Sequence, residues 1–150
     1  MKAKLAFDTS VLVAALVEDH PEHLRAASWL RAPKSVVRMA SAHAFAETWA
    51  VLTAMPIEPR ISGQVALTAL QRLERVVTFV RPDKATYAAA AARCASLGLR
   101  SGTIYDALHL ISAESEQATL FLTFNERDFA RLAETQSPRI VVPSDARPAL

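Results

Sequence analysis

Four carboxylates that are widely separated in the sequence are candidates for chemistry: Asp8, Glu47, Asp106 and Asp128. Clustered carboxylate oxygens, without cysteine ligands or a fixed histidine pattern, favour hard Mg²⁺ or Mn²⁺ over zinc. Such ions bind phosphate oxygens, activate water and stabilise in-line displacement at a phosphodiester. Four acids that meet would repel one another strongly unless a cation neutralised them. The residue types therefore predict metal-assisted hydrolysis of a phosphodiester, if the fold brings these acids together.

Each acid also has a simpler structural interpretation. Asp8 could merely precede a helix cap, and Glu47 lies in an apolar helix where it could pair with His43 or an arginine. Thr103-Ile104-Tyr105-Asp106 has the spacing of a capping box. Asp128 could form the same kind of capping box with an N-cap at Asn125. Taken singly, none of the acids establishes a site.

The elements around the acids indicate how they could converge. Leu5-Ala6-Phe7 is apolar without alternation, as in a strand of a parallel sheet that is covered on both faces. A buried helix follows over residues 11–17, with Thr9 or Ser10 as its cap, and His20-Pro21 resembles the start of the next helix. Further strands are expected at 36–40, 76–80, 120–123 and 139–142, with helices at 21–31, 41–54, 62–74, 83–97, 103–116 and 125–133.

This alternation of strands and helices predicts an α/β fold. We expect a single domain over residues 1–150, built as a three-layer α/β/α sandwich around a mostly parallel sheet of four to five strands. The carboxyl ends of parallel strands and the starts of the following helices share one edge of the sheet. Asp8, Glu47, Asp106 and the turn from Thr123 to Asp128 are therefore expected at that edge.

Composition limits the class of protein. Hydrophobic residues make up 51% of the chain, which argues for a buried core, and the formal net charge of +2 is too small to establish nucleic-acid binding. Cys94 is the single cysteine, so we expect no internal disulfide and a reducing, cytoplasmic location. The basic and apolar start imitates a signal peptide, but Asp8 interrupts it, and no apolar run is long enough to span a bilayer.

Four motifs, in this order, carry a resemblance to a known family. They are Phe7-Asp8-Thr9-Ser10, Glu47 on the third helix, Tyr105-Asp106-Ala107-Leu108, and the segment from Leu122 to Phe129, which reads LTFNERDF. In order, spacing and total length the chain resembles a PIN-domain ribonuclease, and among these it is most similar to the VapC toxins of type II toxin–antitoxin systems. The resemblance covers essentially the whole chain.

The resemblance implies a PIN-like sandwich and an endoribonuclease that depends on Mg²⁺ or Mn²⁺. Asp8, Glu47 and Asp106 match the three most regular acids of the family, which hold the divalent ion or ions. Asn125 occupies a place often taken by Asp, so Asp128 is the candidate for the last carboxylate; if Asp128 serves the helix start instead, a three-acid site remains. The side chains expected to support these acids are Thr9, Ser10, Thr123 and Asn125.

In the implied mechanism, water activated by the metal attacks the scissile phosphate in line, without a nucleophilic side chain. His43 and His109 lie near Glu47 and Asp106 by helical spacing, but we do not include them in the catalytic set because lone histidines beside a site are more often structural. The expected partners are RNA, a small antitoxin and a second copy of the chain, with no membrane. The helices near 21–31 and 62–74 offer candidate interfaces.

Two alternative functions remain open from the sequence. One is a non-catalytic α/β binding module in which the acids serve caps and ion pairs, and the other is a housekeeping RNA-processing PIN nuclease. An aspartyl-phosphate phosphatase is disfavoured because Ser10 stands where a second Asp is required. A Rossmann dehydrogenase is excluded because the turn after the first strand contains no glycine.

Overall fold

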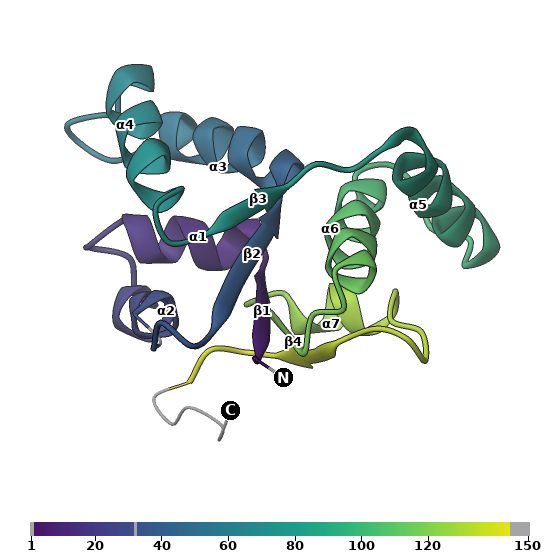
Figure 1. Cartoon of the computed structure of the whole chain (residues 1–150). Coiled ribbons are helices and arrows are strands. Elements are labelled where there is room, and N and C mark those ends of the chain that lie inside the picture. The colour runs from purple at the N-terminus through teal and green to yellow at the C-terminus, as the bar shows by residue number, and fades with distance from the viewer. Residues whose placement is uncertain (1, 32, 145–150) are drawn as a thin grey trace.

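A parallel five-stranded sheet forms the centre of the protein in a computed structural model, which describes residues 2–31 and 33–144 (Figure 1). The strands are β1 (Lys4–Phe7), β2 (Val37–Ser41), β3 (Thr78–Val80), β4 (Leu120–Leu122) and β5 (Arg139–Val141). Their order in the sheet is β3-β2-β1-β4-β5, and every neighbouring pair is parallel. The sequence interpretation of a mostly parallel α/β/α sandwich is confirmed.

Helices cover both faces of the sheet. They are α1 (Thr9–Leu16), α2 (His23–Leu30), α3 (Ala42–Ala54), α4 (Gly63–Leu73), α5 (Lys84–Ser96), α6 (Thr103–Ser115) and α7 (Glu126–Ala130). In Figure 1, α1 to α4 lie on one side of the sheet and α5 to α7 on the other. No helix in the described part of the chain combines the length and apolarity needed to cross a bilayer.

The central strand contributes to the hydrophobic core on both sides. Leu5 and Phe7 pack into the cluster beneath α1, α2 and α4, whereas Ala6 packs into the cluster beneath α5, α6 and α7. The alternating direction of side chains along a strand explains this division, and burial of both faces explains why β1 reads as a continuous apolar run. Asp8 therefore lies directly after a central strand that is enclosed on both faces.

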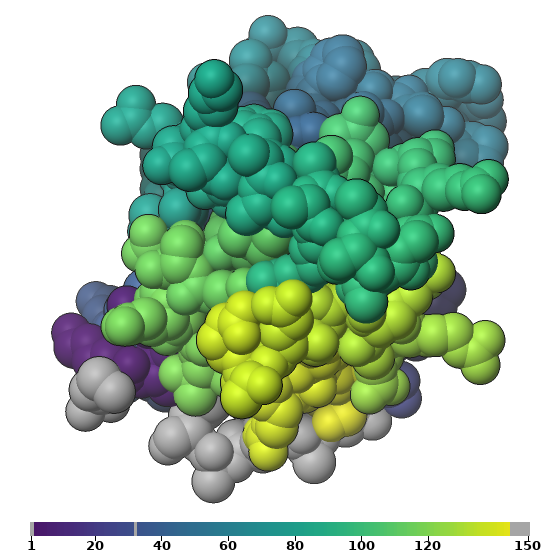
Figure 2. Space-filling view, turned by 90° about the vertical axis from the view of Figure 1, so that its right-hand side faces the viewer, coloured from purple at the N-terminus to yellow at the C-terminus, as the bar shows by residue number. Residues whose placement is uncertain are grey.

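Helix α6 lies between the sheet and an outer layer. Seven consecutive residues, 107–113, are buried, so the helix has almost no solvent-exposed face along this stretch. The view in Figure 2 shows the teal residues of α5 and the yellow residues that follow α7 forming most of the outer surface on this side. Such enclosure fixes the position of any functional side chain that α6 carries.

Local capping rules explain several helix starts. Ser41 and Ser62 cap α3 and α4 with their hydroxyl oxygens, as the sequence predicted. The expectation that Thr9 or Ser10 caps α1 is wrong: Asp8 itself is the cap, in an extended conformation, and its carboxylate accepts the Thr9 N–H. A carboxylate can replace a hydroxyl here because either oxygen satisfies an unpaired N–H of the first turn.

The capping-box interpretation of Asp106 is also wrong. Gly102 occupies the N-cap of α6, and Thr103 is already the first helical residue. The Thr103 hydroxyl donates backward to the Arg100 carbonyl, so it is not available to the helix N–H groups. Asp106 therefore lies in the first turn without a role in closing the helix end.

Several element boundaries also differ from the prediction, and two of these differences have a visible cause. The second helix begins at His23, not at Pro21, because residues 20–22 form a turn in which His20 Nδ1 accepts the Glu22 N–H. The third strand begins at Thr78, because the N–H of Val76 bonds to the carbonyl of Leu73 and prolongs the turn that ends α4. β-Branched residues alone did not distinguish this turn from a strand.

Candidate active site

Asp8 is buried at the carboxyl end of β1, and three donors hold its carboxylate. Only 3% of the residue is exposed. Oδ1 accepts the Thr9 N–H at 2.7 Å, while Oδ2 accepts the hydroxyls of Ser10 and Thr123, each at 2.8 Å. These donors orient both oxygens of the carboxylate. A fixed, buried carboxylate is thus placed where an α/β sheet offers its ligand crevice.

The turn after β4 is tied to the start of α1. The Ser10 hydroxyl oxygen accepts the Phe124 N–H at 3.1 Å, and the Thr123 hydroxyl oxygen accepts the Asn125 N–H at 2.9 Å. The Asp8 N–H donates to the Leu122 carbonyl at 2.9 Å, which extends the pairing of β1 with β4 up to the acid. Ser10 and Thr123 therefore connect the carboxylate to the neighbouring strand end.

Glu47 on α3 is held by two histidines. Its Oε2 lies 3.3 Å from His109 Nε2 on α6 and 3.5 Å from His43 Nε2, one turn earlier on α3. Partial burial raises the pKa of Glu47, but His109, the Thr9 hydroxyl and the charge of His43 together outweigh it, so the pKa lies below its usual value. Both histidines contact the same oxygen.

Asp106 has no compensating partner. No hydrogen bond or ion pair to its side chain occurs among residues 2–31 and 33–144. Burial and the negative charges of Asp8, Glu47 and Asp128 raise the pKa of Asp106 to about 6, although His109 opposes this effect. A carboxylate that is repelled by its neighbours and lacks a cationic partner is suited to receive a cation.

His43 also packs against an aromatic ring at the edge of the site. Its imidazole stacks on Tyr105, with ring centroids 4.8 Å apart and planes 8° apart. Burial and the charge of His109 lower the pKa of His43, and Glu47 only partly offsets them. His43 is therefore predominantly neutral near pH 7.

A cleft of about 420 Å³ joins three of the expected acids. Asp8, Glu47 and Asp106 all line it, together with Thr9, Ser10, Val13, His20, Glu22, Val51, Phe124 and Asn125. Asp128 is not among the lining residues; its side chain is half exposed and lies 3.6 Å from Arg131. The fourth expected acid therefore acts on the cleft only through its charge, which contributes to the raised pKa of Asp106.

The residues in the cleft fit a divalent cation. Asp8, Glu47 and His109 each offer one ligand atom, and these atoms all lie within 4.8 Å of one another. The Thr9 hydroxyl is buried in the same cleft and interacts with the Glu47 carboxylate. Carboxylate oxygens such as those of Asp8 and Glu47 are the ligands that Mg²⁺ and Mn²⁺ prefer.

Sequence reasoning anticipated only one of the two histidines at Glu47 and missed the contact with His109. His43 precedes Glu47 by four residues on one helix, so spacing alone indicates that contact. His109 lies 62 residues from Glu47, and only the packing of α6 beside α3 brings the two together. No local pattern in the sequence contains that information.

Comparison with known proteins agrees with this geometry. The PIN domain model matches residues 5–135 of the chain. Ribonuclease VapC27 of Mycobacterium tuberculosis is 31% identical over 120 residues, which cover 80% of this chain and 84% of VapC27.

Solved structures share the fold. The crystal structure of M. tuberculosis VapC20, described as a sarcin-ricin loop cleaving toxin, matches with a TM-score of 0.69 and 22% identity, over 89% of this chain and 99% of VapC20. The structure of VapBC-1 from nontypeable Haemophilus influenzae matches with a TM-score of 0.66 and 17% identity, over 93% of this chain and 97% of that chain. The protein therefore belongs to the PIN-domain family, as a homologue of the VapC ribonucleases.

Proposed function

We propose that the protein is a divalent-metal-dependent endoribonuclease that hydrolyses RNA phosphodiester bonds and serves as the toxin of a toxin–antitoxin pair. The observation that carries the proposal is the uncompensated Asp106 carboxylate, which shares one cleft with Asp8 and Glu47. Structural ion pairs do not explain it, because no cationic side chain of the described residues pairs with Asp106.

In this proposal Asp8, Glu47 and Asp106 hold Mg²⁺ or Mn²⁺. When bound, the cation supplies Lewis acidity at a phosphate oxygen and lowers the pKa of the attacking water. Asp8 provides the most rigid oxygens, because Ser10 and Thr123 fix its Oδ2. The negative charges of the acids repel the RNA phosphate, so the phosphate can approach only where the bound cation neutralises these charges.

Asn125 and Asp128 have different roles in the proposed site. Asn125 lines the cleft, where its amide can donate to a phosphate oxygen or a hydrated ion. Asp128 lies outside the lining and would serve as an outer carboxylate that increases the negative potential at Asp106. We therefore propose a site of three acids with Asp128 as a peripheral fourth.

The proposed partners are an antitoxin, a second copy of the chain and an RNA in the cytoplasm. The structural neighbours support the antitoxin, since they include VapBC-1 and a Rickettsia felis VapBC2 bound to a DNA fragment from its promoter. Leu24 on α2 and Val65 on α4 are 78% and 59% exposed, so both helices present apolar side chains to a partner.

Cleavage of total cellular RNA by the purified protein tests the proposed activity. We expect cleavage with Mn²⁺ or Mg²⁺, none with chelator, and none by the Asp106→Asn variant. Glu74→Gln is the matched control, because it makes the same carboxylate-to-amide change at an exposed residue of the α4 end. Cleavage by Asp106→Asn at the wild-type rate would refute the site.

Calorimetry with Mn²⁺ distinguishes the proposal from a non-catalytic binding module. The proposal requires wild-type protein to bind Mn²⁺ and Asp106→Asn to bind it more weakly, because one carboxylate ligand has been replaced by an amide. Absence of both Mn²⁺ binding and RNA cleavage in the wild type would favour the binding module.

A further inference from the structure

We propose that His109 is a positioning residue that holds the Glu47 carboxylate in the orientation required for cation binding. It does so as a hydrogen-bond donor, from Nε2–H to Glu47 Oε2, and not as a ligand. This inference rests on the proposed function, because it concerns the same cation site.

The contact between His109 and Glu47 joins two helices that belong to different sides of the sheet. His109 lies one turn after Asp106 on the enclosed helix α6, and its side chain is 1% exposed. Its Nε2 is 3.3 Å from Glu47 Oε2 on α3. A side chain with so little freedom can fix its partner, whereas the Glu47 side chain, 32% exposed, has three rotatable bonds of its own.

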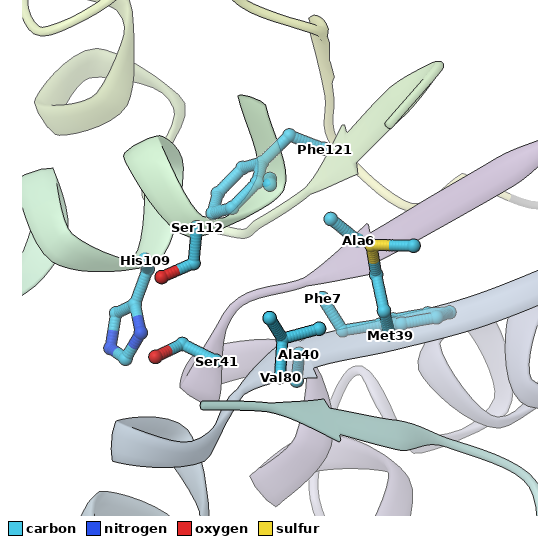
Figure 3. A pocket seen from close by; sticks show the side chains of 10 residues that line it. Ala6, Phe7, Met39, Ala40, Ser41, Val80, His109, Ser112 and Phe121 are labelled. Carbon is cyan, nitrogen blue, oxygen red and sulfur yellow. The ribbon is translucent and has the colours of Figure 1, made fainter. Parts of the chain in front are cut away.

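The surroundings of the other ring nitrogen determine which nitrogen carries the proton. His109 Nδ1 is buried and has no hydrogen-bond partner among the described residues. The ring projects from α6 beside Ser41 and Ser112, and the internal space that these residues line has no room for a water molecule (Figure 3). A proton on Nδ1 would therefore be a buried, unsatisfied donor, and it would leave the Nε2 lone pair facing a lone pair of Glu47 Oε2 at 3.3 Å.

Nε2, the atom that faces Glu47, therefore carries a proton in the neutral ring as it does in the charged ring. In this tautomer Nε2 donates to the carboxylate and has no lone pair for a metal ion. Judged only by its distance from Asp8 and Glu47, His109 Nε2 could also bind the metal ion directly. Direct binding would require the ring proton to be on the enclosed Nδ1, where it has no acceptor among the described residues. The geometry thus favours orientation of Glu47 over direct ligation.

His43 cannot replace this contact. Its Nε2 is farther from Glu47, at 3.5 Å, and its side chain is more exposed and stacked on Tyr105. Hydrogen bonds of partly exposed groups exchange with water and contribute less than enclosed ones. We therefore assign the main positioning role to His109.

Calorimetric titration with Mn²⁺ tests this assignment in the full chain. Because loss of a residue that orients a metal ligand typically lowers metal affinity about 10–100-fold, we expect a loss of this size in His109→Leu. His109→Gln places an amide N–H near the position of Nε2 and should keep the affinity within about 3-fold of wild type, since the donor is preserved. His23→Leu, which removes an imidazole bonded to the Ala14 carbonyl, is the control.

A double-mutant cycle separates positioning from general damage. In the Glu47→Gln background, His109→Leu should cause almost no further loss of Mn²⁺ affinity, because the carboxylate that His109 orients is already absent. A loss of the same size in both backgrounds would show that His109 acts on the fold and would overturn the proposal, as would wild-type affinity in a folded His109→Leu protein.

Magnetic resonance of bound Mn²⁺ tests the ligand alternative directly. We expect no directly coordinated ¹⁴N from His109, and therefore the same spectrum in wild type and His109→Gln. A ¹⁴N coupling that disappears in His109→Gln would overturn the positioning role while leaving the proposed function intact. If the wild type neither binds Mn²⁺ nor cleaves RNA, the proposed function fails together with this inference.

Discussion

Removing the charge of Asp106 should stabilise the metal-free protein. Folding raises the pKa of this carboxyl from 3.8 to about 6, through burial and then through the charges of Asp8, Glu47 and Asp128. Below pH 3.8 the carboxyl is protonated in both folded and unfolded chains and does not change the free energy of unfolding. As the pH rises through 6, the folded chain must hold a charge that the unfolded chain holds more easily, and the full cost is present above that pH.

The magnitude follows from the same values. A pKa change from 3.8 to about 6 lowers the free energy of unfolding by about 3 kcal/mol, at about 1.36 kcal/mol for each pKa unit. Because Asp106 is partly exposed, screening by solvent reduces this to about 1–2 kcal/mol. In a domain of this size, Asp106→Asn should therefore raise the melting temperature in chelator at pH 7.5 by about 2–8 °C.

Thermal unfolding at two pH values, with and without Mn²⁺, provides the assay. In chelator, the advantage of Asp106→Asn should be present at pH 7.5 and disappear at pH 4. Saturating Mn²⁺ should reverse the order, because binding stabilises the wild type more than a variant that lacks a ligand. A variant that melts at or below the wild-type temperature in chelator at pH 7.5 would refute the argument from carboxylate repulsion.

Three further predictions concern other parts of the structure. Thr123→Val removes the 2.8 Å hydrogen bond to Asp8 Oδ2 with little change of volume, and calorimetry should show a fall in Mn²⁺ affinity of about 10–100-fold. Arg93→Met leaves the Glu114 carboxylate, 8% exposed, without its 2.8 Å partner, so urea unfolding should show a loss of about 3–5 kcal/mol. Asp128→Asn, outside the cleft lining, should lower Mn²⁺ affinity by less than about 5-fold, a modest effect expected of a peripheral charge. The role of Arg93 would be contradicted by a loss of unfolding free energy below about 1 kcal/mol. The role of Thr123 would be contradicted by unchanged Mn²⁺ affinity, and the peripheral role of Asp128 by a large loss of Mn²⁺ affinity.

The parts of the fold that depend on local chemistry could be predicted from the sequence. The apolar run before Asp8 identified the enclosed central strand, and serines at 41 and 62 identified two helix starts, because each pattern contains its own physical cause. The parallel edge rule then indicated that Asp8, Glu47 and Asp106 share a site, and all three line one cleft.

Other features depended on competition between neighbouring groups. Thr103 had the right type and spacing for a cap, yet its hydroxyl bonds to the Arg100 carbonyl instead. Val76 has a strong preference for strands, yet its N–H closes the turn after α4. In each case the residue is compatible with two local structures, and contacts with the rest of the fold determine which one forms.

The environment of Glu47 could be predicted only in part. The sequence suggested His43 or an arginine as its partner, and His43 does lie at 3.5 Å, but the closer contact comes from His109. That contact requires α3 and α6 to meet at a particular register and rotation. Such tertiary geometry has no signature within either helix.

The arrangement of the cleft has a consequence for the time at which the protein becomes active during synthesis. Asp8 and Glu47 leave the ribosome before Asp106, His109 and Thr123, which follow Glu47 by at least 59 residues. Because β4 is inserted beside β1 only after α6 is complete, a nascent chain has no assembled site until β4 and the turn after it have emerged. The order of the sequence thus delays the activity of a nuclease in the compartment where its own message is being translated.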